Sequence, residues 1–381
     1  MKKIAIIGGG RMACIFSQNA KEMNIETHCF SPEQGIVDMS AFDFIHPVNI
    51  LEREKVLEIC KEIGIDGVVA TTELTVATAA YVAENMQLHG IPFDVASVIT
   101  DKYRNREATK NVEGLNHPKF AKIHTVDELY SIGFEYPIIL KPTSKGGKRG
   151  ITVIRDRDQI ESAFQYAKAE SGDCGEFVVE EYIDGGMECS VESLSFEGKH
   201  YIVQITEKHT SGAPHCVELA HHQPAPMSEE KRNEVINILC RSFDAIGLNN
   251  STCHTEIKIR NGKVYLIEFN SRPGGDHIAH PLTELSTGFP YIKGAIKVAL
   301  GEFEGYVEDS SKKRCAGVMF VTEQTKELKP IFDKCQQYDW CFKKNHISDE
   351  LKSIVHNDGF NNNCFIYCST EKPNFDELKE N

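Results

Sequence analysis

Residues 255–272, TEIKIRNGKVYLIEFNSR, predict two antiparallel strands joined by a turn at Asn261-Gly262. Polar and apolar residues alternate along the first strand, as they do when a strand has one buried face. Glu268 and Asn270 end the second strand two residues apart, and side chains with that spacing lie on the same face. The hairpin therefore presents a carboxylate and an amide oxygen side by side.

Glu256, on the first strand, shares that face only if the turn has the right length. A two-residue loop would pair Glu256 with Ile267, whose side chain points away from that of Glu268. We predict an odd-length loop with Gly262 in the left-handed conformation. Two carboxylates and an amide oxygen are costly to gather without a cation and suit Mg²⁺, although a solvated outer face of an ordinary hairpin is the alternative.

The first hundred residues alternate short apolar strands with helical segments. Ile4–Ile7, Thr27–Phe30 and Asp66–Ala70 read as strands. This alternation predicts a doubly wound α/β domain with a parallel sheet covered on both faces. Gly8–Ala13 fits GxGxxA, which indicates either a dinucleotide site or a tight turn that requires glycine. We favour the turn, because no clear acidic partner for a ribose ends the second strand.

A glycine-rich loop, Ser144–Gly150, lies between two apolar strands, Ile138–Pro142 and Ile151–Ile154. Its glycines expose backbone N–H groups, and it carries three cations. These features predict a mobile cover for phosphate groups, with an exposed basic turn as the alternative. The three cations are Lys145, Lys148 and Arg149.

Composition excludes several classes of protein. The 381 residues carry a formal net charge of −14, which disfavours general binding to nucleic acid or to a membrane surface. The 13 cysteines are odd in number and scattered, as expected for reduced thiols in a cytoplasmic protein. We see neither a signal peptide nor an apolar stretch of membrane-spanning length.

In their order along the chain, these features resemble the ATP-grasp superfamily of ATP-dependent carboxylate–amine (or carboxylate–thiol) ligases. The resemblance covers roughly residues 1 to 305, and the group of Glu256 with Glu268 is its most specific part. It rests on an N-terminal α/β domain followed by Asp101-Lys102, Ile138–Pro142, the glycine-rich loop, Val179–Ile183 with Gly186-x-Glu188, Glu256, and Glu268-x-Asn270-x-Arg272.

The resemblance implies a role for each matching position. ATP phosphates would contact Lys102 and Lys141, and the loop with Ser144, Gly146 and Gly147 would close over them. Adenine would meet backbone groups of the segment with Glu180, Glu181 and Ile183, and the ribose would meet Glu188. Two Mg²⁺ ions (Mn²⁺ is possible) would bind Glu256, Glu268 and Asn270. Arg272 would steady an acyl phosphate and the tetrahedral intermediate.

Within the superfamily, Ser271–Asp276 followed by Pro281-Leu282 and Thr287-Gly288 looks most like L-amino-acid (dipeptide) ligases. A small-molecule carboxylate would then be activated as an acyl phosphate and attacked by an amine. The irregular segment 207–227 matches no motif, and zinc at its histidines and cysteine fits no zinc module. Candidates for catalysis or substrate contact are Lys208, Arg272, Glu73, Glu218, His222, Gly274 and Gly275.

Other functions stay open. A bicarbonate-using carboxylase of the biotin carboxylase or purine-pathway type is the nearest alternative, and an NAD(P)-binding oxidoreductase or a non-catalytic nucleotide sensor are others. We expect a homodimer by default. The expected divisions are a Rossmann-like domain (1–98), a small ATP-grasp subdomain with the glycine-rich loop (99–184), a large subdomain with the metal site (185–304), and a small C-terminal α/β domain (305–381).

Overall fold

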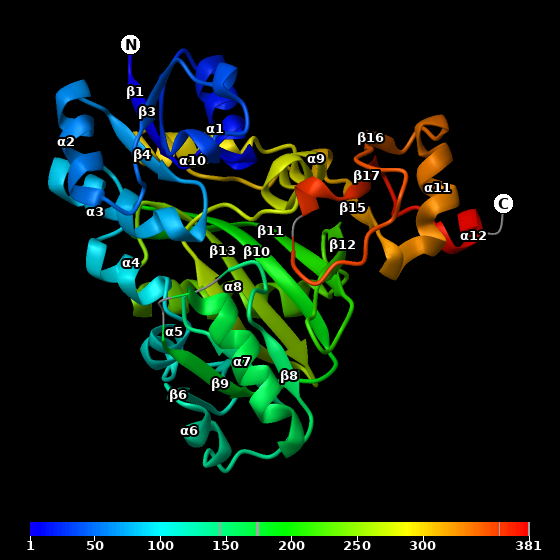
Figure 1. Ribbon diagram of the computed structural model, residues 1–381. Helices are drawn as coiled ribbons and strands as arrows, with labels where there is room; N and C mark the ends of the chain where they lie inside the picture. Colours follow the sequence, from blue (N-terminus) through cyan, green and yellow to red (C-terminus); the bar gives the residue numbers. More distant parts are fainter. Residues whose placement is uncertain (145, 173–174, 358, 380–381) are drawn as a thin grey trace.

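The computed structural model describes the chain except for residues 145, 173–174, 358 and 380–381. The strands of the described residues form one parallel and two mainly antiparallel sheets (Figure 1). The predicted combination of a doubly wound domain with mixed α/β and α+β parts is confirmed. No helix in the described residues is both long and apolar enough to cross a membrane.

The N-terminal sheet is parallel, in the order β3-β2-β1-β4. Alternate residues of β1 face opposite layers: Ile4 and Ile6 pack with α1 and α10, whereas Ala5 and Ile7 pack with α2 and α3. Helices thus cover both faces, as the sequence predicted. The bounds are β1 Lys3–Ile7, β2 Glu26–Ser31, β3 Phe44–Pro47, β4 Gly67–Ala70, α1 Arg11–Glu22, α2 Arg53–Ile63, α3 Val76–Met86 and α10 Tyr291–Ala299.

The turn after β1 is tight for reasons of packing. Gly8 has φ +110°, and a Cβ there would lie 2.4 Å from the Thr71 hydroxyl oxygen. A Cβ on Gly9 would lie 2.8 Å from the Gly35 carbonyl oxygen. Both glycines are therefore required by close approach within the domain, which accounts for the motif without a dinucleotide.

A four-stranded antiparallel sheet, β6-β9-β7-β8, forms the lobe that carries the glycine-rich loop. The loop connects β7 to β8, which pair as the predicted hairpin. Helix α7 packs its apolar face on β7. The bounds are β6 Phe120–Ile123, β7 Ile138–Pro142, β8 Thr152–Ile154, β9 Phe177–Glu181, α6 Val126–Tyr130 and α7 Ile160–Ser171.

The central sheet has nine strands, in the order β16-β17-β15-β12-β11-β10-β13-β14-β5, so strands of the C-terminal segment continue it. Figure 1 shows this segment to the right of the other lobes. The strand bounds are β5 Leu115–Asn116, β10 Met187–Phe196, β11 Lys199–Thr210, β12 Glu218–Gln223, β13 Ser251–Arg260, β14 Lys263–Asn270, β15 Cys315–Val321, β16 Cys341–Asn345 and β17 Asn363–Ser369.

Helix α8 (Glu229–Ile246) covers one face of the central sheet, and its ends follow from the sequence. The Ser228 side chain accepts a hydrogen bond from the Lys231 N–H, and Gly247 ends the helix in the left-handed conformation. Leu239 and Phe243 are fully buried under the sheet, each contributing roughly 1.5–3 kcal/mol. The other helices are α4 Phe93–Ile99, α5 Lys102–Thr109, the π-helix Ile278–Leu282, α9 Thr283–Thr287, α11 Lys329–Lys334 and α12 Phe375–Lys379.

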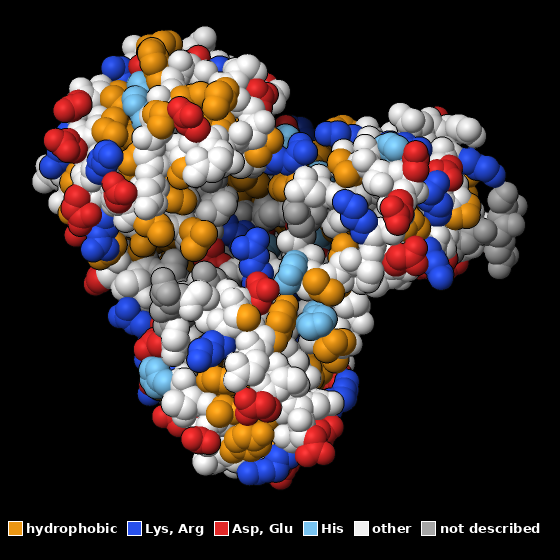
Figure 2. Space-filling model, in the orientation of Figure 1, with side chains coloured by type: hydrophobic (Ala, Val, Ile, Leu, Met, Phe, Trp, Pro, Cys, Tyr) orange, Lys and Arg blue, Asp and Glu red, His pale blue; other side chains and the backbone are white. Residues whose placement is uncertain are grey.

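A cleft with about 1180 Å³ of empty space lies between the small antiparallel sheet and the central sheet. Residues of the N-terminal domain and of the C-terminal segment also line it, among them Glu73 and Asn357. Figure 2 shows the surface hollowed where the lobes meet. All parts of the chain therefore contribute to one cavity.

Candidate active site

Glu256 and Glu268 of the hairpin both line this cleft. The cause is not the turn length that the sequence analysis predicted. The turn is a two-residue turn, with Asn261 (φ 51°) and Gly262 (φ 74°) both left-handed and Arg260 paired with Lys263. The prediction of an odd-length loop is therefore wrong. The register shifts farther along, where Glu256 pairs with Glu268 and Ile257 with Leu266, so that Ile267 is an extra, bulged residue.

The bulge at Ile267 has a second consequence. Its carbonyl oxygen accepts a hydrogen bond from Arg106 Nη2 at 2.7 Å. The fully buried Arg106 also donates through Nε to Glu180 Oε1 at 2.9 Å, and the other Glu180 oxygen is ion-paired with Lys141. Burial would raise the pKa of Glu180, but Arg106 and Lys141 outweigh it and lower the pKa to about 2. Glu180 thus anchors Lys141 at the cleft.

Lys102, the first residue of α5, reaches two carboxylates from different domains. Its Nζ lies 2.7 Å from Glu268 Oε1 and 3.7 Å from Glu73 Oε1. Burial alone would lower the pKa of Lys102, yet the two carboxylates raise it, so the ammonium is retained. For Glu73, burial dominates and raises the pKa of the carboxyl group.

The glycine-rich loop folds over this group. A Cβ on Gly146 would lie 2.2 Å from Glu73 Oε2, so the loop backbone rests directly on that carboxylate. Lys148 points inward, with Nζ 3.4 Å from Glu188 and 3.6 Å from Glu256. Of the three cations of the predicted loop, Lys148 is thus the one found among the cleft-lining residues, Arg149 is not among them, and Lys145 lies outside the described residues.

The C-terminal segment reaches the same loop. The Asn357 N–H donates to the Gly147 carbonyl oxygen at 3.3 Å, and the Asn357 side-chain oxygen accepts from the Glu218 N–H at 2.9 Å. Asn357 also lines the cleft. The segment after residue 305 therefore forms part of the cleft wall, and nothing in the local sequence around Asn357 pointed to this contact.

Strand β12 carries a second bulge, which corrects another prediction. Thr210 pairs with Glu218 and His209 with Ala220, so Leu219 is the extra residue. The bulge places Glu218 and His221 on one side, with His221 Nε2 3.0 Å from Glu218 Oε2. His222, predicted as a substrate contact, instead forms a hydrogen bond with Tyr367, and burial lowers its pKa to about 2.

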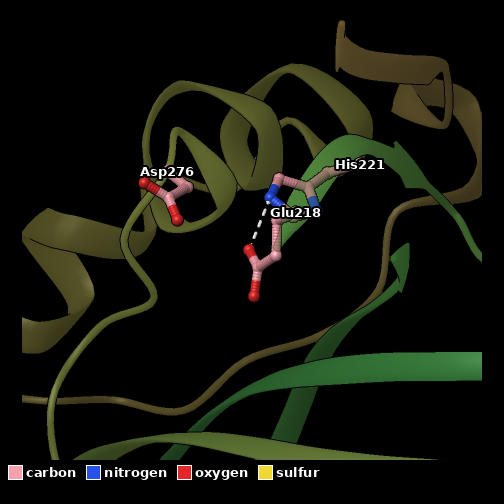
Figure 3. A group of neighbouring side chains, drawn as sticks. All are labelled: Glu218, His221 and Asp276. Carbon is pink, nitrogen blue, oxygen red and sulfur yellow. Dashed lines mark ion pairs between the residues drawn. The ribbon is translucent and has the colours of Figure 1, made fainter. Parts of the chain in front are cut away.

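Glu218, His221 and Asp276 form the one group of potential metal ligands found among the described residues (Figure 3). Lys208 Nζ already lies 2.6 Å from Glu218 and 2.8 Å from Glu256. This buried ammonium supplies the positive charge between the two carboxylates. Burial, and then Glu218, raise the pKa of Asp276 to about 6. Lys208, predicted as catalytic, is thus a bridge behind the cleft wall.

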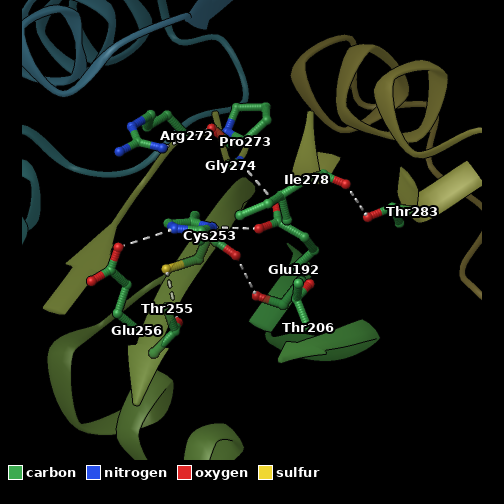
Figure 4. A network of polar contacts seen from close by, with 12 residues as sticks. Glu192, Thr206, Cys253, Thr255, Glu256, Arg272, Pro273, Gly274, Ile278 and Thr283 are labelled. Atoms are coloured by element: carbon green, nitrogen blue, oxygen red, sulfur yellow. Dashed lines mark hydrogen bonds and ion pairs between the residues drawn. The ribbon is translucent and has the colours of Figure 1, made fainter. Parts of the chain in front are cut away.

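The segment after β14 divides between the cleft and the protein interior. Arg272 and Gly275 line the cleft, whereas the Gly274 N–H donates to Glu192 Oε2 at 3.0 Å (Figure 4). Gly274, predicted as a substrate contact, therefore serves packing. His254, which the sequence reading missed, lines the cleft and pairs with Glu192. Burial lowers the pKa of His254, but Glu192 outweighs this and raises it.

Most predicted site residues meet in this one cleft. Those that line it are Glu73, Lys102, Lys141, Gly146, Gly147, Glu180, Glu181, Ile183, Glu188, Glu218, Glu256, Glu268, Arg272 and Gly275. Asn270 is buried beside them, and Ser144 is exposed. The residues considered for zinc do not converge: His209 packs on His222, His215 on Tyr166, and Cys216 lies near Tyr182.

Comparison with known proteins agrees with this geometry. The family profile described as an ATP-grasp domain matches residues 134–280. That range holds the glycine-rich loop, both cross-strand glutamates and Arg272. Residues 134–280 form an ATP-grasp domain. The resemblance inferred from the sequence, and with it the prediction of an ATP-dependent ligase-type enzyme, is confirmed at this level.

Proteins similar to this chain include two kinds of enzyme. The 2-oxoglutarate carboxylase small subunit of Hydrogenobacter thermophilus is 24% identical over 331 residues, 81% of this chain and 68% of that protein. An alanine–anticapsin ligase of Bacillus subtilis is 27% identical over 275 residues, 62% of this chain and 57% of that protein. The chain thus spans little more than half the length of the ligase that it matches.

Solved structures share the fold over the whole chain. The L-amino acid ligase from Bacillus licheniformis has a TM-score of 0.82 at 21% identity, covering 100% of this chain and 96% of that one. The biotin carboxylase domain of the Hydrogenobacter thermophilus 2-oxoglutarate carboxylase has a TM-score of 0.73 at 19% identity, covering 97% and 86%. These similarities establish the ATP-grasp fold. They do not identify the substrates, which have to be inferred from the residues of the cleft.

Proposed function

We propose that the protein is an ATP-dependent carboxylate–amine ligase that joins amino acids, releasing ADP and phosphate. The observation that carries this proposal is the composition of the cleft between the small antiparallel sheet and the central sheet. Lysines from α5, β7, β13 and the glycine-rich loop line it, together with two cross-strand glutamates, Arg272, Glu73 and Glu218. Such a site offers separate groups for phosphates, for metal and for a substrate ammonium.

The carboxylate pair fits Mg²⁺. Glu256 and Glu268 are opposite each other on the cleft side, and the buried Asn270 Oδ1 has no hydrogen-bond partner among the described residues. Two carboxylates and an amide oxygen are hard ligands of the kind that Mg²⁺ combines with nucleotide phosphates. Bound there, Mg²⁺ would neutralise phosphate charge. Binding of two ions, with Mn²⁺ as a substitute, is part of the proposal.

The cations of the cleft would hold the triphosphate of ATP. Lys141 is fixed by Glu180, Lys102 comes from the start of α5, and Lys148 comes from the glycine-rich loop. Closure of the loop on Glu73 would keep water away from an activated acyl group. Apolar side chains, including those of Ile139 and Ile183, line the same cleft and would accept the adenine ring.

The chemistry follows from these charges. The substrate carboxylate attacks the γ-phosphorus, ADP leaves, and the carboxylate oxygen carries the phosphoryl group. An amine then attacks the carbonyl carbon, the C–N bond forms, and phosphate leaves as the nitrogen loses a proton. Arg272 would stabilise the negative charge of this step. Glu73 and Glu218, with His221 beside Glu218, would bind the ammonium group of the amino acid whose carboxylate is activated.

The test is ADP and phosphate release on mixing the protein with ATP, Mg²⁺ and pairs of amino acids, followed by the mass of the product. We expect turnover that requires two amino acids and a product mass equal to their sum less one water. If no amino acid from a broad panel stimulates ADP release, the ligase proposal is wrong.

The relatives favour one other candidate, an ATP-dependent carboxylase that consumes bicarbonate. Stimulation of ADP release by bicarbonate plus an acceptor, without an amino acid, would support it. NADH binding without ATP binding would indicate an oxidoreductase, and ATP binding without turnover a nucleotide sensor. The biotin carboxylase domain similar in structure is a dimer, and we propose a homodimer here, testable by light scattering.

A further inference from the structure

We propose that Glu192 and His254 form a positioning pair that fixes the metal-binding carboxylate of Glu256 and the turn behind Arg272. This inference rests on the metal site of the proposed function. Glu192 lies on β10, directly opposite His254 on the adjacent strand β13, and Ser190 lies opposite Glu256. The pair therefore lies on the same sheet as the two candidate metal ligands Glu256 and Glu268, next to Glu256.

Both oxygens of Glu192 are used. Its side chain is fully buried, and Oε1 forms a hydrogen bond with His254 Nδ1. Oε2 accepts a hydrogen bond from the Gly274 N–H at 3.0 Å (Figure 4). A Cβ on Gly274 would lie 2.6 Å from both Glu192 Oε1 and His254 Nδ1. The turn that follows Arg272 is thus pressed against the pair and bonded to it.

The other nitrogen of His254 continues the chain of contacts into the cleft. Nε2 lies 3.5 Å from Glu256 Oε1, which also receives Lys208 Nζ at 2.8 Å. Because Nδ1 is held by Glu192, the orientation of the imidazole ring is set from the interior. One buried carboxylate thereby links a candidate metal ligand to the backbone that precedes Gly275.

The cost of this arrangement argues for a positioning role. A fully buried carboxylate is expensive, and apolar residues of similar volume often serve the fold equally well or better. Groups that orient metal ligands, by contrast, typically change metal affinity by about 10–100-fold when they are removed. Glu192 fits this positioning role, since its hydrogen bonds to His254 and to the Gly274 N–H lead to Glu256 and to the turn behind Arg272.

The experiment measures metal binding directly. Mn²⁺ binding by the full chain is followed by EPR in the presence of a non-hydrolysable ATP analogue, for the wild type and for Glu192→Gln. We expect Mn²⁺ to bind at least about 10-fold more weakly to the variant. The matched control is Ser193→Ala, which removes another buried hydrogen bond, from the Ser193 hydroxyl to the Cys253 carbonyl, one residue along β10. It should bind Mn²⁺ as the wild type does.

A second variant separates weaker Mn²⁺ binding from loss of the folded state. Glu192→Leu/His254→Phe replaces the buried pair by apolar side chains, a change that can be neutral for stability. We expect this protein to unfold in the same range of urea as the wild type and still to bind Mn²⁺ at least about 10-fold more weakly. Wild-type Mn²⁺ affinity in either folded variant would overturn the proposal. Failure of the ligase proposal would instead show as wild-type protein that binds Mn²⁺ and nucleotide but turns over no amino acid.

Discussion

Glu256 and Glu268 lie directly opposite each other on β13 and β14, although the two-residue turn between these strands would by itself pair Glu256 with Ile267. The extra residue at the bulge corrects the register by one, so both carboxylates face the cleft. The same bulge frees the Ile267 carbonyl for Arg106. One irregularity thus creates the candidate metal site and ties it to the lobe that carries Lys141.

Glu268→Gln should abolish turnover while the fold is kept. The substitution preserves shape but removes a charge that Lys102 and a bound metal both require. We expect the rate of ADP release to fall by at least about 100-fold, the scale on which loss of one preorganised charge-stabilising group reduces kcat. Circular dichroism checks the fold. Glu234→Gln, at an exposed ion pair on α8, is the control; an active Glu268→Gln enzyme would contradict the metal assignment.

Gly146→Ala should disturb closure of the glycine-rich loop. The new Cβ would lie 2.2 Å from Glu73 Oε2, so either the loop or the Glu73 carboxylate, which is paired with Lys102, must move. We expect KM for ATP to rise by about 10-fold or more, because misplacement by about 1 Å is costly in a closed site. Steady-state kinetics of ADP release measure this change.

Gly10→Ala is the matched control for this substitution, since a Cβ at Gly10 meets no atom within 4 Å. It should leave KM for ATP unchanged. In a Glu73→Ala background, Gly146→Ala should add little further loss, because the colliding carboxylate is gone. Equal effects of Gly146→Ala with and without Glu73 would refute the contact.

Alternation along β13 and β14 was enough to select Glu256 and Glu268, which line the same cleft. The order of motifs was enough to place both in an ATP-grasp domain. Single-residue bulges were not visible in that alternation. For this reason, the sequence analysis explained the common face of Glu256 and Glu268 by an odd-length turn and not by a bulge at Ile267. For the same reason, it selected His222 and not His221 as a candidate substrate contact. A bulge depends on which carbonyl or side chain finds a partner in another element, and local sequence does not carry that information.

Contacts from distant segments were equally hidden. Asn357 reaches the glycine-rich loop from the C-terminal segment, and Arg106 reaches Ile267 from α5, over separations of more than a hundred residues. Neither residue lies in a motif. By contrast, Lys102 and Lys141 could be named because their neighbours along the chain resemble those of known ATP-grasp proteins.

Arg106→Met should destabilise the protein strongly. Arg106 is fully buried between Glu180 Oε1 and the Ile267 carbonyl, so its loss leaves a buried carboxylate underpaired and a bulge carbonyl without this donor. Breaking a buried ion pair from one side costs about 3–5 kcal/mol. Urea denaturation gives the free energy of unfolding. Arg104→Met, on the exposed side of the same helix, should change it by less than about 1 kcal/mol; equal losses for the two would be inconsistent with this role.

Asp276→Asn should stabilise the protein at neutral pH and not in acid. The carboxyl pKa is about 6 in the folded protein, against 3.8 for the unperturbed group, because burial and then Glu218 disfavour the charged form. The folded state therefore binds this proton more tightly, and the cost of ionisation grows as the pH rises from 3.8 to 6 and is fully present above 6. Asparagine never ionises and can still accept the hydrogen bond from the Gly359 N–H.

The free energy of unfolding of Asp276→Asn and of the wild type, measured by urea denaturation from pH 4 to pH 7.5, checks this sign. The difference in favour of the variant should be largest above pH 6 and shrink steadily toward pH 4, because protonated aspartate and asparagine are then equivalent in charge. Asp309→Asn is the opposite control: Ser311 lowers the pKa of the Asp309 carboxyl, so removing that charge should bring no gain at neutral pH. If the difference between Asp276→Asn and the wild type did not change with pH, the prediction that burial and Glu218 disfavour ionisation of Asp276 would be wrong.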